Sequence, residues 1–265
     1  MTLHVPIGRR TLFILLFLLV VVLFCGWIIW QFNEVTTRSG SHNYYYSIDL
    51  SYNTTIRNVT LVVPLPEVNN TPVFIPRLTD GTAYGISPDW NLTLVYKNNT
   101  PMLSIRAERM VPKYYGYPVA IEPGASILPT TRIPGHEYSV DAPVLMPVTI
   151  NTMETSRSEI NTRLPVGHEP IFSPEGVFTP GSGSPFMSNY LTYDHTVPVY
   201  ISYTADQPVL LSLRVNVQGV NAVWRGGWRS NSYSDTVALE ITNGTQGWID
   251  AEAHLLTDDK IRTIT

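Results

Sequence analysis

The sequence predicts an all-β ectodomain behind a single N-terminal transmembrane helix. Residues 11–30 contain no charged side chain, which is typical of a segment that crosses a bilayer. After residue 42, apolar and polar residues alternate with a period of two in several short runs, as in half-buried strands. Outside residues 11–30, no run has the spacing of a long helix. We therefore expect a β-sandwich, immunoglobulin-like in general architecture and built from one or two packed units.

The uncharged segment has the properties of a retained signal anchor. Its twenty residues span about 30 Å as a helix, which matches the hydrocarbon core of a bilayer. A cleaved signal has a shorter apolar region and ends at small residues, whereas this segment ends with Trp27 and Trp30. Arg9 and Arg10 precede it, so the positive-inside rule places residues 1–10 in the cytoplasm. Residues 31–42 then form a stalk outside the plasma membrane, and the C-terminal domain is extracellular.

Composition narrows the class of protein further. The part after residue 30 has a formal charge of −6, from 21 acidic residues and 15 of the 17 basic ones. The basic residues are dispersed, which argues against nucleic acid as a partner. The single cysteine, Cys25, lies in the apolar segment, so the ectodomain folds without disulfides. Six N-x-[ST] triplets add possible glycosylation sites, and together these features favour a glycoprotein of an archaeal cell surface. The six are Asn53, Asn58, Asn69, Asn91, Asn98 and Asn243.

Residues 43–110 are expected to form a first β unit of four strands. Alternation in residues 43–52 and 59–65 predicts two strands, which we interpret as a hairpin. Residues 92–97 and 102–110 flank Asn98-Asn99-Thr100-Pro101, a turn-forming group, and predict a second hairpin.

The second half of the chain divides into a proline-rich middle and a second β unit. Residues 111–190 hold 12 of the 21 prolines, which excludes long regular elements, but their aromatic residues favour ordered loops packed on the sheets. Within them, alternation over residues 138–151 with prolines on one face predicts an edge strand. Residues 191–257 form the second β unit and residues 258–265 a polar tail. The predicted strands of the second β unit are 197–203, 209–217, 237–242 and 248–255, and Asn243-Gly244 joins the last two.

Three pairs of adjacent histidine and carboxylate residues are the candidates for a catalytic or metal centre. The sequence has neither the paired histidines of a zinc helix nor a calcium loop of alternating aspartates. It also lacks a G-x-S-x-G elbow and a phosphate-binding glycine loop. We therefore assign no catalytic residue, no metal ligand and no cofactor. An alternative function, a surface hydrolase with a carboxylate or metal centre, would draw on His136, Glu137, His168, Glu169, Asp194 and His195.

Residues 224–229, Trp-Arg-Gly-Gly-Trp-Arg, are the most distinctive candidates for surface contact. The glycine pair suits a two-residue hairpin turn, which would place Trp and Arg side chains together at a tip. Such a tip either stacks on a sugar ring or a protein partner, or forms an internal cation–π pair that stabilises the hairpin. The ligand-contact candidates are Trp224, Arg225, Trp228 and Arg229.

The leading functional hypothesis is a non-catalytic one. We expect a single-pass cell-surface protein with a binding or structural role at the envelope, with a glycan or a protein as partner. Besides the hydrolase, a second alternative is an accessory subunit of a membrane complex, which would expose a large apolar patch. An enzyme would bring several of the six histidine and carboxylate residues into one cleft, whereas a binding module would leave them scattered.

Overall fold

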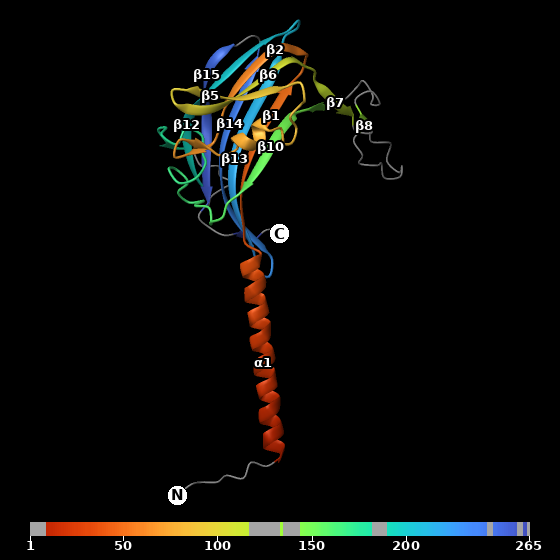
Figure 1. Ribbon diagram of the computed structural model, residues 1–265, viewed down its shortest axis with the longest axis vertical. Coiled ribbons are helices and arrows are strands. Elements are labelled where there is room, and N and C mark those ends of the chain that lie inside the picture. The colour runs from red at the N-terminus through yellow and green to blue at the C-terminus, as the bar shows by residue number, and fades with distance from the viewer. Residues whose placement is uncertain are drawn as a thin grey trace. The chain divides into compact units, whose positions relative to one another are not determined.

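The computed structural model (Figure 1) describes residues 9–116, 133–134, 144–181, 190–242, 246–258 and 262–263. The chain divides into two compact units. The helix unit comprises Met1–Ser41, Ala222–Ser230 and Ile261–Thr265, and the sheet unit comprises His42–Asn221 and Asn231–Lys260.

The helix unit is dominated by α1, which runs from Arg9 to Arg38. Leu, Ile, Val and Phe fill most of its first two thirds, and none of this apolar window is buried by the protein. The helix therefore has the length and composition needed to cross a membrane. It continues eight residues beyond Trp30, so most of the predicted stalk is helical. Glu34 and Arg38, one turn apart, form an ion pair that supports this last part.

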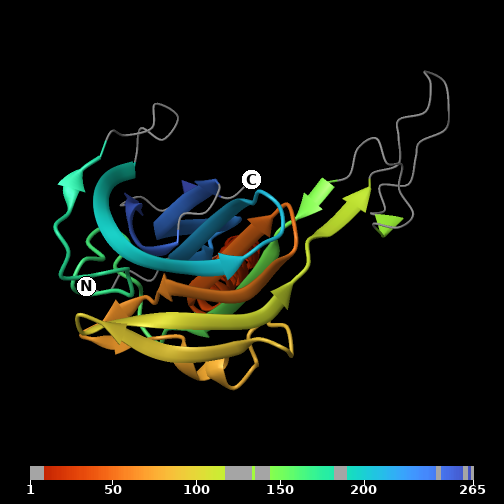
Figure 2. The same ribbon diagram turned by 90° about the horizontal axis from the view of Figure 1, so that it is seen from above.

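The sheet unit is built on one curled antiparallel sheet (Figure 2). Along the sheet the strands follow the order β10-β1-β13-β14-β15-β12-β2-β6-β5; in addition, β11 pairs with β12 and β16 with β14. The strands are β1 (Ser41–Tyr52), β2 (Ile56–Pro64), β5 (Asn91–Lys97), β6 (Thr100–Met110), β10 (Val148–Thr155), β11 (Thr179–Pro180), β12 (Tyr190–Thr204), β13 (Leu210–Trp224), β14 (Trp228–Thr242), β15 (Gly247–Asp258) and β16 (Arg262–Thr263). Two small sheets add β3 (Glu67–Val68) with β4 (Thr71–Pro72), and β7 (Lys113–Gly116) with β8 (Ile133–Pro134) and β9 (Val144–Met146).

The core lies on the concave face of the curled sheet. In β13, alternate residues from Leu211 to Val217 are buried while those between them reach the other face. The curl brings β1 opposite β2, where the buried Tyr46 hydroxyl donates a hydrogen bond to the Pro64 carbonyl at 2.9 Å. The Tyr46 ring also stacks on Phe74, with centroids 5.5 Å apart. The result is the expected β-rich, sandwich-like body behind an N-terminal apolar helix.

One predicted strand pairing is wrong and two are confirmed. β1 and β2 are consecutive but not paired, because the short connection at residues 53–55 carries the chain across the concave space. β1 pairs instead with β10 and β2 with β6 and β12. The hairpin of β5 and β6 and the pairing of β14 with β15 follow the prediction. β10 lies at one end of the main sheet, but the predicted edge strand over residues 138–151 is not continuous. Pro147 separates β9, which belongs to a small sheet, from β10, and residues 138–143 lie outside the described chain.

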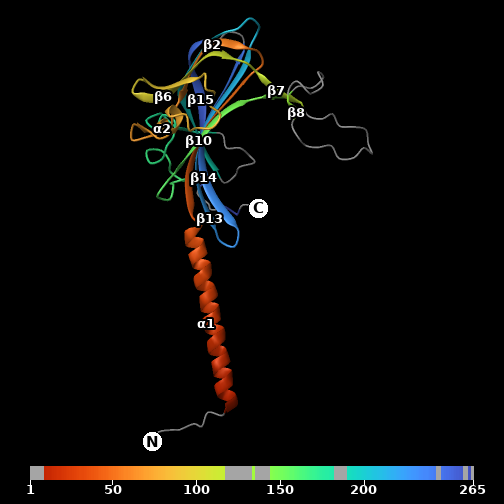
Figure 3. The ribbon, with the colours of Figure 1, turned by 45° about the vertical axis from the view of Figure 1, so that its right-hand side comes forward.

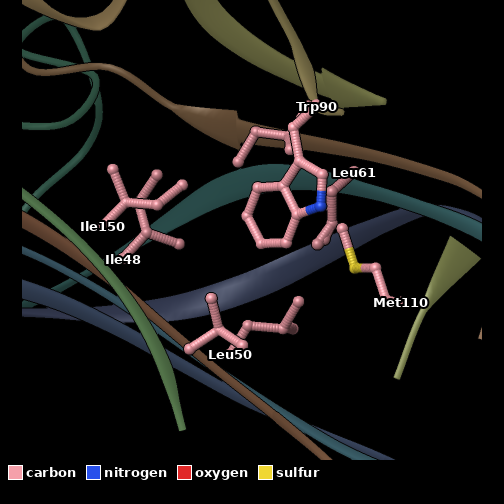
Figure 4. A pocket seen from close by; sticks show the side chains of 8 residues that line it. Ile48, Leu50, Leu61, Trp90, Met110 and Ile150 are labelled. Atoms are coloured by element: carbon pink, nitrogen blue, oxygen red, sulfur yellow. The ribbon is translucent and has the colours of Figure 1, made fainter. Parts of the chain in front are cut away.

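Residues 65–90 close the side of the curl and contain the short helix α2 (Ile75–Thr79). Two isolated bridges, Glu67 with Ile171 and Tyr84 with Asn151, connect the segment to the rest of the unit. Trp90 points into the apolar space between β1, β2 and β10 (Figure 4) and leaves a void of only about 10 Å³. A void of this size and lining holds no ligand and stays dry, so this region is packed core.

The described part of the proline-rich middle is ordered and packed. Residues 156–181 cover one end of the concave face, where Ile160 and Ile171 pack with Tyr233 and Leu255 in a second apolar cluster. Gly219 in β13 makes room for this packing, because a Cβ there would lie 2.3 Å from the Tyr233 ring. Residues 117–132, 135–143 and 182–189 lie outside the described chain.

Candidate functional site

The predicted Trp-Arg tip, residues 224–229, is the turn between β13 and β14. Three residues, Arg225 to Gly227, join the strands, one more than expected. Gly226 adopts a left-handed conformation with φ of 72°, and the Arg225 N–H donates to the Gly227 carbonyl at 2.8 Å. The two glycines thus form the tight reversal that the sequence indicated.

The tip belongs to the helix unit and packs against the end of α1 (Figure 3). The ring of Trp224 lies 5.6 Å from that of Phe32, centroid to centroid. The backbone N–H of Trp224 donates a hydrogen bond to the Ser39 hydroxyl at 2.9 Å. β16 adds a short strand to β14 here, with Arg229 opposite Thr263. Two contacts therefore hold the tip along the last turns of the helix.

The polar and aromatic groups of the tip remain available for contact. Trp228 is 48% exposed, and Arg225 and Arg229 are exposed. Within the described chain, no ion pair or cation–π contact involves either arginine; the cation–π contact found there joins Lys97 to Trp248. The internal Trp–Arg pair that was the alternative explanation of this motif is therefore not formed.

The four described histidine and carboxylate candidates come from two places, the loop of residues 156–181 and strand β12. His168 lies on an exposed turn, whereas the neighbouring Glu169 is buried and accepts hydrogen bonds from the Tyr44 hydroxyl and the Asn161 N–H. Both oxygens of Glu169 thus have donors, which makes it a structural group for the loop above β1. His136 and Glu137 lie outside the described residues.

Asp194 and His195 also point in opposite directions, as neighbours on a strand do. The His195 Nε2 lies 2.8 Å from Asp235 Oδ1, and both side chains are fully buried. Asp235 Oδ2 accepts the Phe172 N–H at 2.8 Å, and the Phe178 ring covers the imidazole. This pair ties the loop of residues 156–181 to β12 and β14.

On the opposite face, Asp194 joins a surface group that the sequence prediction missed. Its Oδ1 lies 2.7 Å from His254 Nδ1, and Glu252 places a carboxylate oxygen within 4.8 Å of both. The alternation Glu252-x-His254 in β15 was the available signal, but its position opposite Asp194 depends on strand pairing. One nitrogen and two carboxylates are suitable metal ligands, yet the group is largely exposed.

A polar pocket of about 240 Å³ is lined by two glutamates and turn residues of three loops. Glu67 is only 5% exposed and its Oε2 has no hydrogen-bond partner. Burial, with the nearby charge of Glu175, raises the pKa of the Glu67 carboxyl above its ordinary value. Asn70, Asn98 and Asn99 also line the pocket, each with positive φ. None of the four described histidine and carboxylate candidates lines this pocket or the void beside Trp90.

The predicted glycosylation sites are on the surface where they are described. Asn53, Asn58, Asn69, Asn91 and Asn98 are all exposed, and Asn243 lies outside the described residues. Comparisons with protein-family models, with curated proteins and with solved structures find no significant match. Functional inference therefore rests on the chain itself.

Proposed function

We propose that the protein is a single-pass, membrane-anchored cell-surface protein with a non-catalytic binding or structural role at the envelope. In this proposal α1 crosses the plasma membrane, residues 1–10 remain in the cytoplasm, and the sheet unit is extracellular. The proposal depends on one observation above all: the apolar window of α1 is not buried by any of the described residues. Phe13 and Phe17, for example, are 69% and 68% exposed.

The apolar surface of α1 favours its insertion into a bilayer. Each large apolar side chain kept in water forgoes roughly 1.5–3 kcal/mol that burial would supply, and α1 carries a continuous series of them. A bilayer supplies that burial over about 30 Å, which is the length of residues 11–30. The two arginines immediately before this stretch favour the N-terminus inside, since the next basic residue after it is Arg38, eight positions beyond Trp30.

The arrangement of polar residues supports a non-catalytic role. Of the four described candidates for a hydrolytic centre, Glu169 and His195 are buried and engaged in structural hydrogen bonds, while His168 and Asp194 reach solvent on other surfaces. A hydrolase would need an open cleft that presents several of them to substrate.

Topology can be tested by cysteine labelling, because Cys25 is the single native cysteine. In a Cys25→Ser background, one chain carries Thr93→Cys on exposed β5 and a matched chain carries Thr2→Cys. A membrane-impermeant maleimide added to intact cells should label position 93, and position 2 only after permeabilisation. Extraction with alkaline carbonate should leave both chains in the membrane fraction. The reverse labelling pattern, or release by carbonate, would contradict the proposal.

A further inference from the structure

The position of the Trp-Arg tip along α1 defines its depth relative to a bilayer. The helix is about 45 Å long, whereas a hydrocarbon core is about 30 Å thick. If residues 11–30 fill that core, Phe32 lies about 3 Å beyond it. The headgroup layer on each side is roughly 5–8 Å thick. Phe32, and the Trp224 ring in contact with it, are therefore level with the headgroups.

The contacts of Trp224 also give the direction of its side chain. Its backbone N–H is bonded to Ser39, at the end of the helix, while its ring contacts Phe32, seven residues closer to the apolar segment. The indole therefore extends along the helix axis toward the hydrocarbon side. The three-residue turn that follows carries the other tip residues into the same neighbourhood (Figure 3).

The chemistry of the tip matches a phospholipid headgroup layer. Tryptophan favours this layer because its ring is apolar and its N–H is a hydrogen-bond donor. Arginine binds phosphate through several N–H donors in a fixed plane. Residues 222–230 carry two arginines and no acidic residue, and neither guanidinium has a protein partner within the described chain. The tip therefore presents a half-exposed indole and cationic donors that no described residue pairs.

We propose that the Trp-Arg tip is a lipid-binding site that inserts into the headgroup layer of the leaflet at the outer end of α1. Trp228 lies at the boundary with the acyl chains, and Arg225 and Arg229 bind lipid phosphates. This inference rests on the proposed function, since it requires that α1 crosses the bilayer. A glycan or a protein, the partners expected from sequence, would have to reach a surface that is already at headgroup level.

The depth of the tip can be measured by spin labelling of the full chain in nanodiscs of phosphatidylcholine with phosphatidylglycerol. Gly227 is a suitable position, because a Cβ there meets no atom within 4 Å and its φ is ordinary. In a Cys25→Ser background, Gly227→Cys carries the nitroxide and leaves both Trp and both Arg residues intact. Val177→Cys, at a position 83% exposed in the sheet unit, is the aqueous control, and native Cys25 is the lipid control.

Power saturation with oxygen and with a water-soluble nickel complex reports depth at each label. We expect position 25 in lipid, position 177 in water, and position 227 several-fold less accessible to nickel than position 177. Adding Arg225→Gln and Arg229→Gln should return position 227 toward the accessibility of position 177.

Three outcomes would overturn the proposal. If position 25 is in lipid but position 227 is as open to nickel as position 177, the tip proposal fails and the anchor stands. The tip proposal also fails if position 227 becomes protected only after envelope glycan or protein is added. If position 25 is itself accessible to nickel, both proposals fail.

Discussion

At the scale of single residues, the polar groups that the sheet unit buries determine its response to pH. Glu67 is the clearest case, because its carboxyl is almost fully buried and one oxygen has no donor. A carboxyl in this position costs free energy when it ionises. Tyr46 and Tyr233 are also buried, but their hydroxyls donate to the carbonyls of Pro64 and Pro170, so they are satisfied in the neutral form.

Replacing Glu67 should therefore change stability in a pH-dependent way. Since the folded state raises the Glu67 pKa above its ordinary 4.5, it holds the proton to higher pH than the unfolded state. This contribution to the free energy of unfolding is complete below pH 4.5 and is lost as pH rises through the folded pKa. Glu67→Gln should be more stable than the parent at pH 7, by about 1 kcal/mol, with a smaller difference at pH 4.

Urea unfolding at several pH values measures this difference directly. Glu175→Gln is the matched control, because it removes only the neighbouring charge and leaves the Glu67 carboxyl buried. Its stability gain at pH 7 should be smaller. A difference between Glu67→Gln and the parent that does not change with pH would show that the Glu67 pKa is not raised.

At the scale of elements, sequence periodicity predicted strands and faces well but not all pairings. The alternation over residues 209–217 placed Leu211, Leu213 and Val215 on the buried face, as observed. The connection at residues 53–58, however, was interpreted as a hairpin turn, because a short polar connection has the same local sequence whether it joins paired strands or crosses a concave space. The crossing depends on the curl of the whole sheet, which local sequence does not encode.

The candidate site shows the same division between local and long-range information. Gly226 and Gly227 predicted the hairpin turn from local rules. The contact of Trp224 with Phe32 joins positions far apart in the chain and has no local signature. The burial of Glu67 likewise depends on its bridge to Ile171 in a distant loop. Chemistry that depends on such contacts could be identified only in the folded chain.

The segment of residues 65–90 closes the curl, and substitutions at two of its glycines measure how closely it packs against β10. Gly81 and Gly85 both have positive φ, at 76° and 85°. A Cβ at Gly81 meets nothing within 4 Å, whereas one at Gly85 would lie 1.8 Å from the Thr149 carbonyl oxygen. Gly81→Ala should cost only the backbone strain, about 1 kcal/mol. Gly85→Ala should cost about 2 kcal/mol more, because the segment must move away from β10.

Thermal unfolding of the two variants provides the comparison. Since their backbone strain is similar, the difference between their midpoints isolates the close approach of Gly85 to β10. We expect Gly85→Ala to melt several degrees below Gly81→Ala. Equal losses would mean that the contact between residues 84–85 and β10 contributes little to closing the curl.

At the scale of the whole molecule, the two units depend on different surroundings. Every buried residue of the main apolar cluster belongs to the sheet unit, and none of those described comes from α1. The sheet unit therefore buries its core without the helix, whereas the helix leaves its apolar surface to be covered by something else. Stability of the sheet and attachment to a membrane are in this view separable properties.

A chain that begins at Ser39 should accordingly fold and stay soluble without detergent. We expect cooperative thermal unfolding of this fragment, with a midpoint within a few degrees of the full chain in detergent, because the loss of α1 removes no described core side chain. A chain that begins at Asn53 is the contrasting control, since it lacks β1 and with it Tyr46, Ile48 and Leu50 of the core. Each large apolar side chain lost from the core costs about 2–5 kcal/mol, and the loss of β1 also removes its pairing with β10. Together these losses exceed a domain's usual stability of about 5–15 kcal/mol. That control should not fold. Aggregation or a broad, non-cooperative transition in the Ser39 fragment would instead show that the sheet unit requires the helix.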